Sequence, residues 1–335
     1  MSVILVGSLR TSHLPAGRSA KRNGWRHLCL CLAVLGMTGV SAQTNEYIPS
    51  TEELKALSLE QLMKQEVTMV ARRPAQWFTS PSAVQVITGE DIRRSGAWNI
   101  PEALRLAPNL HVAQVDTTSW AITARGFNRG SSIGSGIGFN FGTANKLQVL
   151  IDGRSVYTPL FAGVLWDVQD TLLQDIDRIE VISGPGAALW GANAVNGVIN
   201  IITKSAKDTQ GVLLTAGGGT QLQDFAGFRY GSTLATNVFF RIYGKYFDRN
   251  SIVFPNGDEA SNDWRMGQGG FRMDWLPANG DTIKLQSDGY MGSTDQPVLN
   301  NAVANGQNVL GRWTHVIKED SDFSIQSYWD RTDRD

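Results

Sequence analysis

The sequence predicts an α+β domain followed by antiparallel transmembrane β-barrel strands that form an incomplete barrel. Residues 75–205 mix short helical and short extended patterns, which is typical of an α+β domain. From residue 206 onward the chain shows strands of about ten residues in which apolar and polar side chains alternate. A segment with the features of an export signal precedes both regions.

Residues 1–42 are predicted to be a cleaved signal peptide. A basic stretch ending at Arg26 precedes a short apolar run at 28–36, and a small-residue cleavage site ends at Ala42. The alternative is an uncleaved membrane anchor. We expect cleavage, because the apolar run is too short for the roughly 30 Å hydrocarbon core of a bilayer.

Cysteine content and charge exclude several kinds of function. Both cysteines lie in the predicted signal, so the mature chain is expected to lack disulfides and thiolate metal sites. The chain has 30 Lys and Arg against 31 Asp and Glu, and 5 of the basic residues fall in the signal, which leaves 25 against 31. Nucleic-acid binding depends on a basic surface, so no nucleic-acid partner is expected.

Capping residues place two short helices in the α+β domain. Thr88 is expected to cap a helix that stops at Gly96. Asn99 is expected to cap a second helix, with Glu102 three residues later as in a capping box, and Pro108 is expected to end it.

Short apolar runs predict the strands of this domain. They lie at 84–88, 147–151, 177–183 and 198–203. Asp152 and Gly153 form a turn signal directly after the second of these strands. Between the last two strands, the segment from Gly184 contains a glycine-rich turn and a short helical stretch.

Beyond residue 206, alternation predicts strands that face two different environments. The segments are 238–247, 271–275, 283–289 and 323–329, with turn signals at 255–257, 279–280 and 305–306. In the first segment, Phe240, Ile242 and Tyr246 share one face, whereas Arg241, Tyr243 and Lys245 share the other. The pattern is typical of strands with lipid on one side and a polar lumen on the other. The alternative is a soluble β-sandwich with one wet face.

Four motifs occur in the order found in a known family. They are ARGF at Ala124–Phe127, LIDG at Leu150–Gly153, DRIEV at Asp177–Val181 and GPGAALWGANAVNGVINIITK at Gly184–Lys204. Together they resemble the plug domain of TonB-dependent outer-membrane receptors. The resemblance implies a signal peptide at 1–42, an N-terminal extension with a TonB box at 43–74, a plug at 75–205 and the first barrel strands at 206–335.

The resemblance also implies the function. Receptors of this family take up a scarce ligand across the outer membrane, and a ferric siderophore is the commonest choice. The partners implied are TonB with its inner-membrane energising complex, an extracellular ligand such as a metal chelate, and outer-membrane lipid. Neither a cofactor nor enzymatic activity is expected. Such barrels have about 22 strands, so the chain is expected to be an N-terminal fragment.

A short extended run resembles the TonB box. It consists of Glu66, Val67, Thr68, Met69, Val70 and Ala71. An extended, β-branched segment near the mature N-terminus can pair with a partner strand through main-chain hydrogen bonds. Pro74 follows closely and is expected to keep the run out of an internal strand. The alternative is an edge strand of the plug or an ordinary linker.

Further site residues follow from the resemblance. Ligand contacts from apical loops of the plug are assigned to Phe127, Asn128, Arg129, Phe139, Asn140, Phe141, Tyr157 and Trp166. A charge network between plug and barrel is assigned to Arg125, Arg178 and Glu180. The alternatives are flexible filler within the lumen for the loops, and solvated strand-end charges for the network.

Two motifs that suggest other chemistries are set aside. Gly130–Gly134 matches the G-x-S-x-G pattern around Ser132, but a nucleophile elbow needs a strand before it and a helix after it. Gly184 and Gly186 lack the third glycine and later acid of a dinucleotide fingerprint. No metal site is expected. The rival functions are a truncated, non-transporting, plug-like periplasmic binding module and a periplasmic hydrolase.

Overall fold

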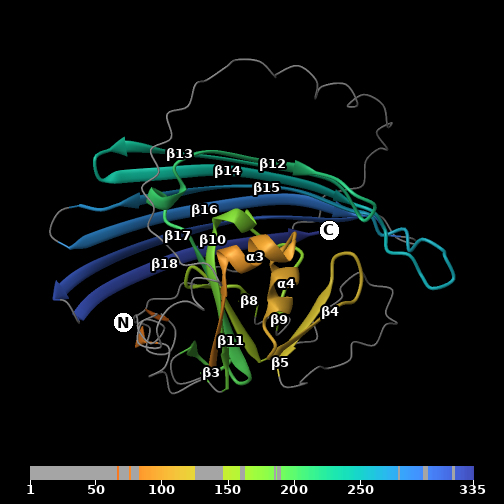
Figure 1. Ribbon diagram of the computed structural model, residues 1–335, viewed down its shortest axis with the longest axis horizontal. Helices are drawn as coiled ribbons and strands as arrows, with labels where there is room; N and C mark the ends of the chain where they lie inside the picture. The colour runs from red at the N-terminus through yellow and green to blue at the C-terminus, as the bar shows by residue number, and fades with distance from the viewer. Residues whose placement is uncertain are drawn as a thin grey trace, which may run out of the picture.

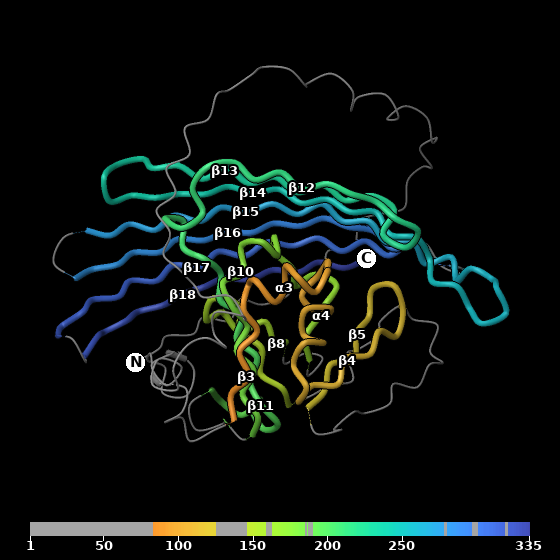
Figure 2. Tube along the Cα trace, in the orientation of Figure 1, coloured from red at the N-terminus to blue at the C-terminus, as the bar shows by residue number. Residues whose placement is uncertain are grey.

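The computed structural model describes residues 66–67, 75–76, 83–124, 146–158, 163–184, 186, 190–277, 280–296, 301–318 and 321–335. An α+β domain lies under one face of a large antiparallel sheet, as Figure 1 and the Cα trace in Figure 2 show. We call this large sheet the wall. Among the described residues, no helix combines the length and the apolar character needed to cross a membrane.

A five-stranded sheet forms the centre of the α+β domain. In spatial order its strands are β3 (Ala83–Thr88), β10 (Ile176–Ser183), β11 (Gly197–Thr203), β6 (Leu147–Ile151) and β7 (Arg154–Ser155). β10 pairs antiparallel with both β3 and β11, whereas β6 runs parallel to β11. The four strands predicted from apolar runs are therefore confirmed within one residue at each end.

Two helices follow β3, as the capping residues predict. Helix α3 (Gly89–Ser95) begins at Thr88, whose hydroxyl accepts a hydrogen bond from the Asp91 amide, and it ends at Gly96 with φ of 73°. Helix α4 (Ile100–Ala103) begins at Asn99, whose side chain accepts from the Glu102 amide. The chain then continues in a 3-10 turn at Leu104–Leu106. The complete capping box is at Thr88 and Asp91, because the Glu102 carboxylate instead binds Arg105.

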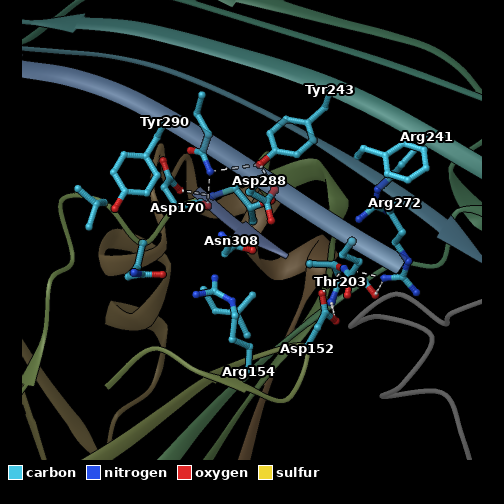
Figure 3. A pocket seen from close by; sticks show the side chains of 17 residues that line it. Asp152, Arg154, Asp170, Thr203, Arg241, Tyr243, Arg272, Asp288, Tyr290 and Asn308 are labelled. Atoms are coloured by element: carbon cyan, nitrogen blue, oxygen red, sulfur yellow. Dashed lines mark hydrogen bonds between the residues drawn. The ribbon is translucent and has the colours of Figure 1, made fainter. Parts of the chain in front are cut away.

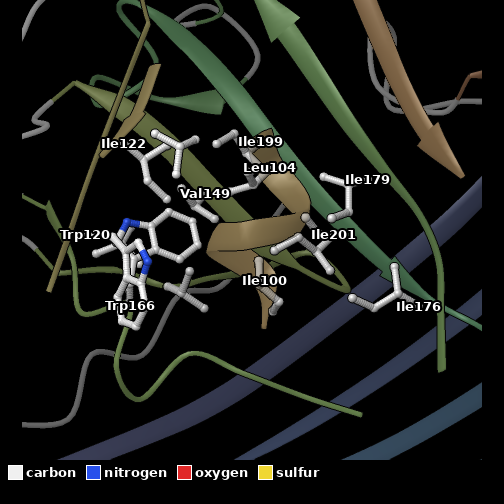
Figure 4. Close-up of a cluster of buried hydrophobic side chains, with 14 of the residues drawn as sticks. Ile100, Leu104, Trp120, Ile122, Val149, Trp166, Ile176, Ile179, Ile199 and Ile201 are labelled. Carbon is white, nitrogen blue, oxygen red and sulfur yellow. The ribbon is translucent and has the colours of Figure 1, made fainter. Parts of the chain in front are cut away.

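The main core fills the space between the five-stranded sheet, α4 and the hairpin of β4 (Leu110–Gln114) and β5 (Trp120–Ala124). Figure 4 shows Ile100 and Leu104 from the helical segment meeting Ile199 and Ile201 from β11. Burial of such side chains stabilises the fold by about 1.5–3 kcal/mol each.

Two further pairs of short strands complete the described part of this domain. β8 (Tyr157–Thr158) pairs with β9 (Gly163–Val164). β1 (Glu66–Val67) pairs with β2 (Ala75–Gln76). β1 has a neighbour on one side only, so the first two residues of the 66–71 run form an edge strand and not an internal one.

The wall is a seven-stranded antiparallel meander. Its strands, in both chain and spatial order, are β12 (Gly211–Gly217), β13 (Leu222–Ala235), β14 (Val238–Arg249), β15 (Trp264–Trp275), β16 (Asp281–Thr294), β17 (Ala302–Lys318) and β18 (Ser321–Arg334). At one end the strands are joined by the connections 218–221, 250–263 and 295–301, which include the two longest of the wall. We call this the long-loop end. At the opposite end the connections are 236–237, 276–280 and 319–320.

The two faces of the wall differ as the alternation predicts. Arg241 on β14 is buried against the α+β domain, whereas its neighbours Ile242 and Tyr246 are exposed on the outer face. Other large apolar side chains exposed on wall strands include Val212, Leu214, Phe228, Leu285, Met291, Val309, Trp313, Ile325 and Trp329. The outer face is thus apolar and exposed, and the inner face is polar and covered.

One predicted turn is wrong. Asn305 and Gly306 lie inside β17, where Gly306 pairs with Tyr290 of β16. A Cβ atom at Gly306 would collide with the Tyr290 hydroxyl and with the Arg331 carbonyl. The glycine therefore makes room for a ring on the neighbouring strand. The turn itself lies at 295–301, before β17 begins.

Candidate functional site

The interface between the α+β domain and the wall is the candidate functional site. It surrounds a small cavity, and Figure 3 shows polar side chains from both sides pointing into it. The space open to the centres of water molecules is about 30 Å³, which is room for a few waters and not for a larger ligand. The lining includes Asp152, Arg154, Asp170 and Thr203 from the domain, and Arg241, Tyr243, Gln268, Arg272, Gln286, Asp288, Tyr290 and Asn308 from the wall.

Asp152 joins the domain to the wall at the turn after β6. Its carboxylate accepts hydrogen bonds from Thr203, through the amide at 3.1 Å and the hydroxyl at 2.7 Å. The wall contributes a third hydrogen bond, because Gln286 Nε2 donates to Asp152 Oδ2 at 2.8 Å. Arg312 Nη2 also donates to the Asp152 carbonyl at 2.7 Å. Asp152 has a left-handed turn conformation, with φ of 50°, and its side-chain carboxylate and its main-chain carbonyl both contact the wall.

The charge of Asp152 is held by the surrounding cations. Burial by itself raises the pKa of this carboxyl. The positive charges of Lys284 and Arg272 outweigh that effect, and hydrogen bonds from Gln286 and Thr203 add to them. The resulting pKa of Asp152 lies well below its usual range, so the group is ionised at neutral pH.

A second group of contacts surrounds the end of β11. Arg272 Nη1 donates to the carbonyl of Thr203 at 3.1 Å and to its hydroxyl at 2.8 Å, and Arg272 pairs with Asp274 at 2.9 Å. Arg241 Nη1 donates to the Lys204 carbonyl at 2.7 Å. Arg241 also lies 3.4 Å from Asp175. These wall arginines hold the strand that leads from the domain into the wall.

The segment after β9 is held by several wall strands at once. Lys245 of β14 pairs with Asp170, and Gln268 of β15 donates to the Asp170 carbonyl at 2.6 Å. Arg334 of β18 binds both carboxylate oxygens of Asp167 at 2.8 Å. Both contacts of Arg334 come from Nη2, so one donor lies between the two carboxylate oxygens of Asp167.

An aromatic cluster closes the interface at the long-loop end. Trp98 and Trp120 of the domain meet Phe247 and Trp264 of the wall, with ring centroids 4.6–6.3 Å apart. The guanidinium of Arg249 lies 4.7 Å from the centroid of the Trp98 ring. The interface therefore combines ionic contacts along its length with an aromatic contact at one end.

Only some of the sequence-predicted site residues fall in the described part of the chain. Glu66 and Val67 of the TonB box form β1, while Thr68, Met69, Val70 and Ala71 lie outside the described residues. Arg125, Phe127, Asn128, Arg129, Phe139, Asn140 and Phe141 also lie outside them.

The remaining assignments fall on three environments. Tyr157 is half-buried on β8. Trp166 packs in the core of the domain and is 7% exposed, and its assignment as a ligand contact stays a prediction. Arg178 pairs within the domain, with Glu180 at 2.8 Å and with Asp177. Their network with the wall stays a prediction.

Sequence reasoning missed the residues that form the described interface. Asp152 stood in a predicted turn, and Arg241 and Lys245 stood on the predicted polar face of a strand. The polar face predicted for this wall strand was therefore the signal that could have located the wall side of the interface. Partners that lie far apart in sequence, such as Asp170 and Lys245, leave no local pattern that would pair them.

Comparisons with known proteins match the α+β domain to a family. Residues 78–198 match the family model described as the TonB-dependent receptor plug domain. The vitamin B12 transporter BtuB of Vibrio cholerae is 32% identical over 158 residues, which are 47% of this chain and 23% of that protein. BtuB of Vibrio vulnificus is 27% identical over 183 residues, or 54% and 27%. The chain thus spans about a quarter of these curated relatives.

Solved structures share the fold. The ferric-catecholate import receptor Fiu from E. coli has a TM-score of 0.61 at 14% identity, covering 81% of this chain and 42% of that one. The copper transporter OprC has a TM-score of 0.58 at 15% identity, covering 75% and 37%. The family model shows that residues 78–198 are a plug domain of the TonB-dependent receptor type. The BtuB relatives are similar to about half of the chain, and the solved structures share the fold of a plug followed by the strands of a barrel wall, which is unclosed here.

Proposed function

We propose that this chain carries the plug and first wall strands of a receptor for energised ligand uptake across the outer membrane. The observation that supports it is the contrast between the two faces of the wall. The outer face exposes apolar side chains such as Leu214 and Met291, at 72% and 70%. The inner face carries arginine, lysine and glutamine side chains that bind the plug. Lipid outside and a plugged polar lumen inside fit such a receptor.

The energy for uptake is proposed to arrive through the segment Glu66–Ala71. We assign this run as the TonB box, which pairs with TonB when the inner-membrane complex is energised. The ladder of Glu66–Val67 with Ala75–Gln76 shows that the main chain here accepts strand pairing. An extended segment that pairs by its main chain can exchange one partner strand for another.

A ferric siderophore is the proposed ligand class. Fiu, which shares the fold, is a ferric-catecholate receptor. Vitamin B12 is the second candidate, because the BtuB relatives with 27–32% identity are B12 transporters. The cavity at the plug–wall interface is too small for either ligand, so binding is proposed for the apical side of the plug.

Uptake by the intact receptor tests the proposal. Cells that lack their own siderophore and B12 receptors would express this receptor and be given iron-55 siderophores or cobalt-57 cobalamin. We expect accumulation of one ligand class, abolished by deletion of TonB. Binding without TonB-dependent accumulation would instead support the plug-like binding module and overturn the transport proposal.

Val67→Pro tests the TonB box. Proline removes the Val67 amide and with it one strand-pairing hydrogen bond. We expect ligand binding at the cell surface to stay normal and uptake to fall at least about tenfold, since the box could no longer pair along its length. Val67→Ile keeps the amide and the β-branched shape and is expected to transport normally. Normal uptake by Val67→Pro would show that the box lies elsewhere.

A further inference from the structure

We propose that Arg249, Trp98 and Trp120 form a subsite for a carboxylate group of the imported ligand, at the long-loop end of the plug–wall interface. The inference rests on the proposed uptake function and names the ligand chemistry. Arg249 is the last residue of β14, and its side chain enters the aromatic cluster where Trp264 of β15 begins the next strand.

The guanidinium of Arg249 is buried and, within the described residues, forms no salt bridge or hydrogen bond with a carboxylate. The nearby Glu102 carboxylate acts on it only through the electrostatic field and is itself bound to Arg105. Arg249 is 2% exposed, and its Nε and Nη1 atoms have no hydrogen-bond partner. Nη2 donates to Gln114 Oε1 at 3.3 Å, which is a neutral acceptor at long range. The other contact is the face of Trp98. A buried cation is normally paired with an anion. Arg249 therefore differs from wall arginines such as Arg334, which pairs with a plug carboxylate.

A second orphaned donor lies in the same cluster. Trp120 is 2% exposed, and its indole Nε1 also has no hydrogen-bond partner. The Trp120 ring lies 6.3 Å from that of Trp98, which in turn contacts Arg249. Two side chains of the same aromatic cluster, one from the plug and one from the wall, thus carry buried N–H groups without a hydrogen-bond partner among the described residues.

The unmet groups are all donors, and this sets the chemistry of the ligand. Guanidinium and indole N–H groups donate and do not accept. An ionised carboxylate only accepts, and its hydrogen bonds to a guanidinium are charge-assisted. The surrounding rings of Trp98, Phe247 and Trp264 exclude water, which strengthens the attraction between opposite charges. One unpaired cation fits one anionic group.

The place of the cluster gives the ligand a way in. Beyond Arg249 the chain enters the connection 250–263, drawn in cyan in Figure 1, which extends past the end of the wall. Gln114 ends β4 and leads into the turn at 115–119. Both connections carry exposed apolar residues, including Val115 at 43%, Val253 at 63% and Phe254 at 50%. A ligand that reaches the cluster from the long-loop side would have to displace one of these two connections.

Citrate is the probe for the test, because it carries several carboxylates and no metal. The intact receptor in detergent would be titrated with citrate in a calorimeter at low and high salt. We expect saturable binding that weakens at high salt. Arg249→Met is expected to weaken it at least about tenfold, since a charge-assisted hydrogen bond is lost. Trp120→Phe keeps the ring, loses only the N–H group and is expected to weaken binding about threefold or more.

Arg265→Met is the matched control. Arg265 lies next to Trp264 in β15, is 49% exposed at its side chain and pairs with Asp295, so citrate binding is expected to be unchanged. If Arg249→Met fails to fold, as judged by circular dichroism, Trp120→Phe decides alone. Absence of citrate binding by the wild type, or equal binding by Trp120→Phe, would overturn the subsite. In that case, TonB-dependent uptake of a neutral chelate would still support the proposed function. If citrate binding were intact but no TonB-dependent uptake occurred, the proposed function alone would be overturned.

Discussion

At the scale of single residues, Asp152 is the carboxylate that both parts of the molecule use. It binds Thr203 within the plug and Gln286 on the wall, close to the charges of Lys284 and Arg272. Asp152→Ala leaves those cations without their counter-charge. We expect a loss of about 3–5 kcal/mol in the free energy of unfolding of the plug, measured by urea-dependent proteolysis of the intact receptor. Asp258→Ala, on an exposed loop, is expected to change it by less than about 0.5 kcal/mol.

The low pKa of Asp152 also sets the direction of a pH effect. A carboxyl whose pKa is lower in the folded protein than in the unfolded chain stabilises the fold above its ordinary pKa of 3.8. That contribution is lost as the pH falls below this value. We expect the stability difference between wild type and Asp152→Asn to be constant from about pH 5 to 8 and to shrink below about pH 4. A difference that grows on acidification would contradict the assignment.

Two glycines of β17 make a matched pair. Gly306 faces the Tyr290 hydroxyl and the Arg331 carbonyl, whereas a Cβ at Gly311 meets nothing within 4 Å. We expect Gly306→Ala to destabilise the wall by about 1–3 kcal/mol through overpacking, and Gly311→Ala to be near neutral. Thermal unfolding of the two variants in detergent measures the difference. Equal melting temperatures would show that the ring of Tyr290 moves aside freely.

At the scale of elements, the start of α3 depends on Thr88. Its hydroxyl accepts from the Asp91 amide, and the Asp91 carboxylate accepts from the Thr88 amide at 3.0 Å. Thr88→Ala removes the first of these bonds, and we expect a loss of about 1 kcal/mol in plug stability by urea titration. Thr88→Ser keeps the hydroxyl and is expected to retain most of the stability that the cap contributes.

The elements that local chemistry specifies were predictable. Thr88, Gly96 and Asn99 act within a few residues of themselves, so both ends of α3 and the start of α4 follow from the sequence. The end of α4 does not, because the helix stops at Ala103 and a 3-10 turn follows, well before the predicted end at Pro108. The turn signal at Asn305 and Gly306 failed because a residue on another strand decides the conformation there. Local patterns predict an element well when no distant side chain competes for the same space.

At the scale of the whole molecule, ion pairs between plug and wall hold two bodies together. Arg334 binds Asp167 through two hydrogen bonds, and both side chains are largely buried. A double-mutant cycle with Asp167→Asn and Arg334→Gln is expected to give a coupling energy of about 1–3 kcal/mol in plug stability. The exposed pair Arg331 and Asp333, on the same strand, should give less than about 1 kcal/mol. Equal coupling in the two cycles would mean that burial adds nothing.

The order of domains was predictable from the sequence, but the way they meet was not. Four motifs and a change in periodicity indicated a plug followed by wall strands. Which carboxylate faces which cation depends on the register of the wall and on the docking of the plug. Lys245 and Asp170, for example, are 75 residues apart in the chain. The aromatic cluster at Trp98 and Trp264 was not predicted for the same reason.

The wall binds the plug although its two outermost strands, β12 and β18, each have a strand neighbour on one side only. The strands of the wall, from β13 to β18, already supply the arginine, lysine and glutamine side chains that grip it. During assembly, therefore, the plug can dock onto the growing sheet as soon as these strands are paired. In a barrel that closed after this docking, the plug would already lie inside, and no folded domain would have to pass through a finished pore.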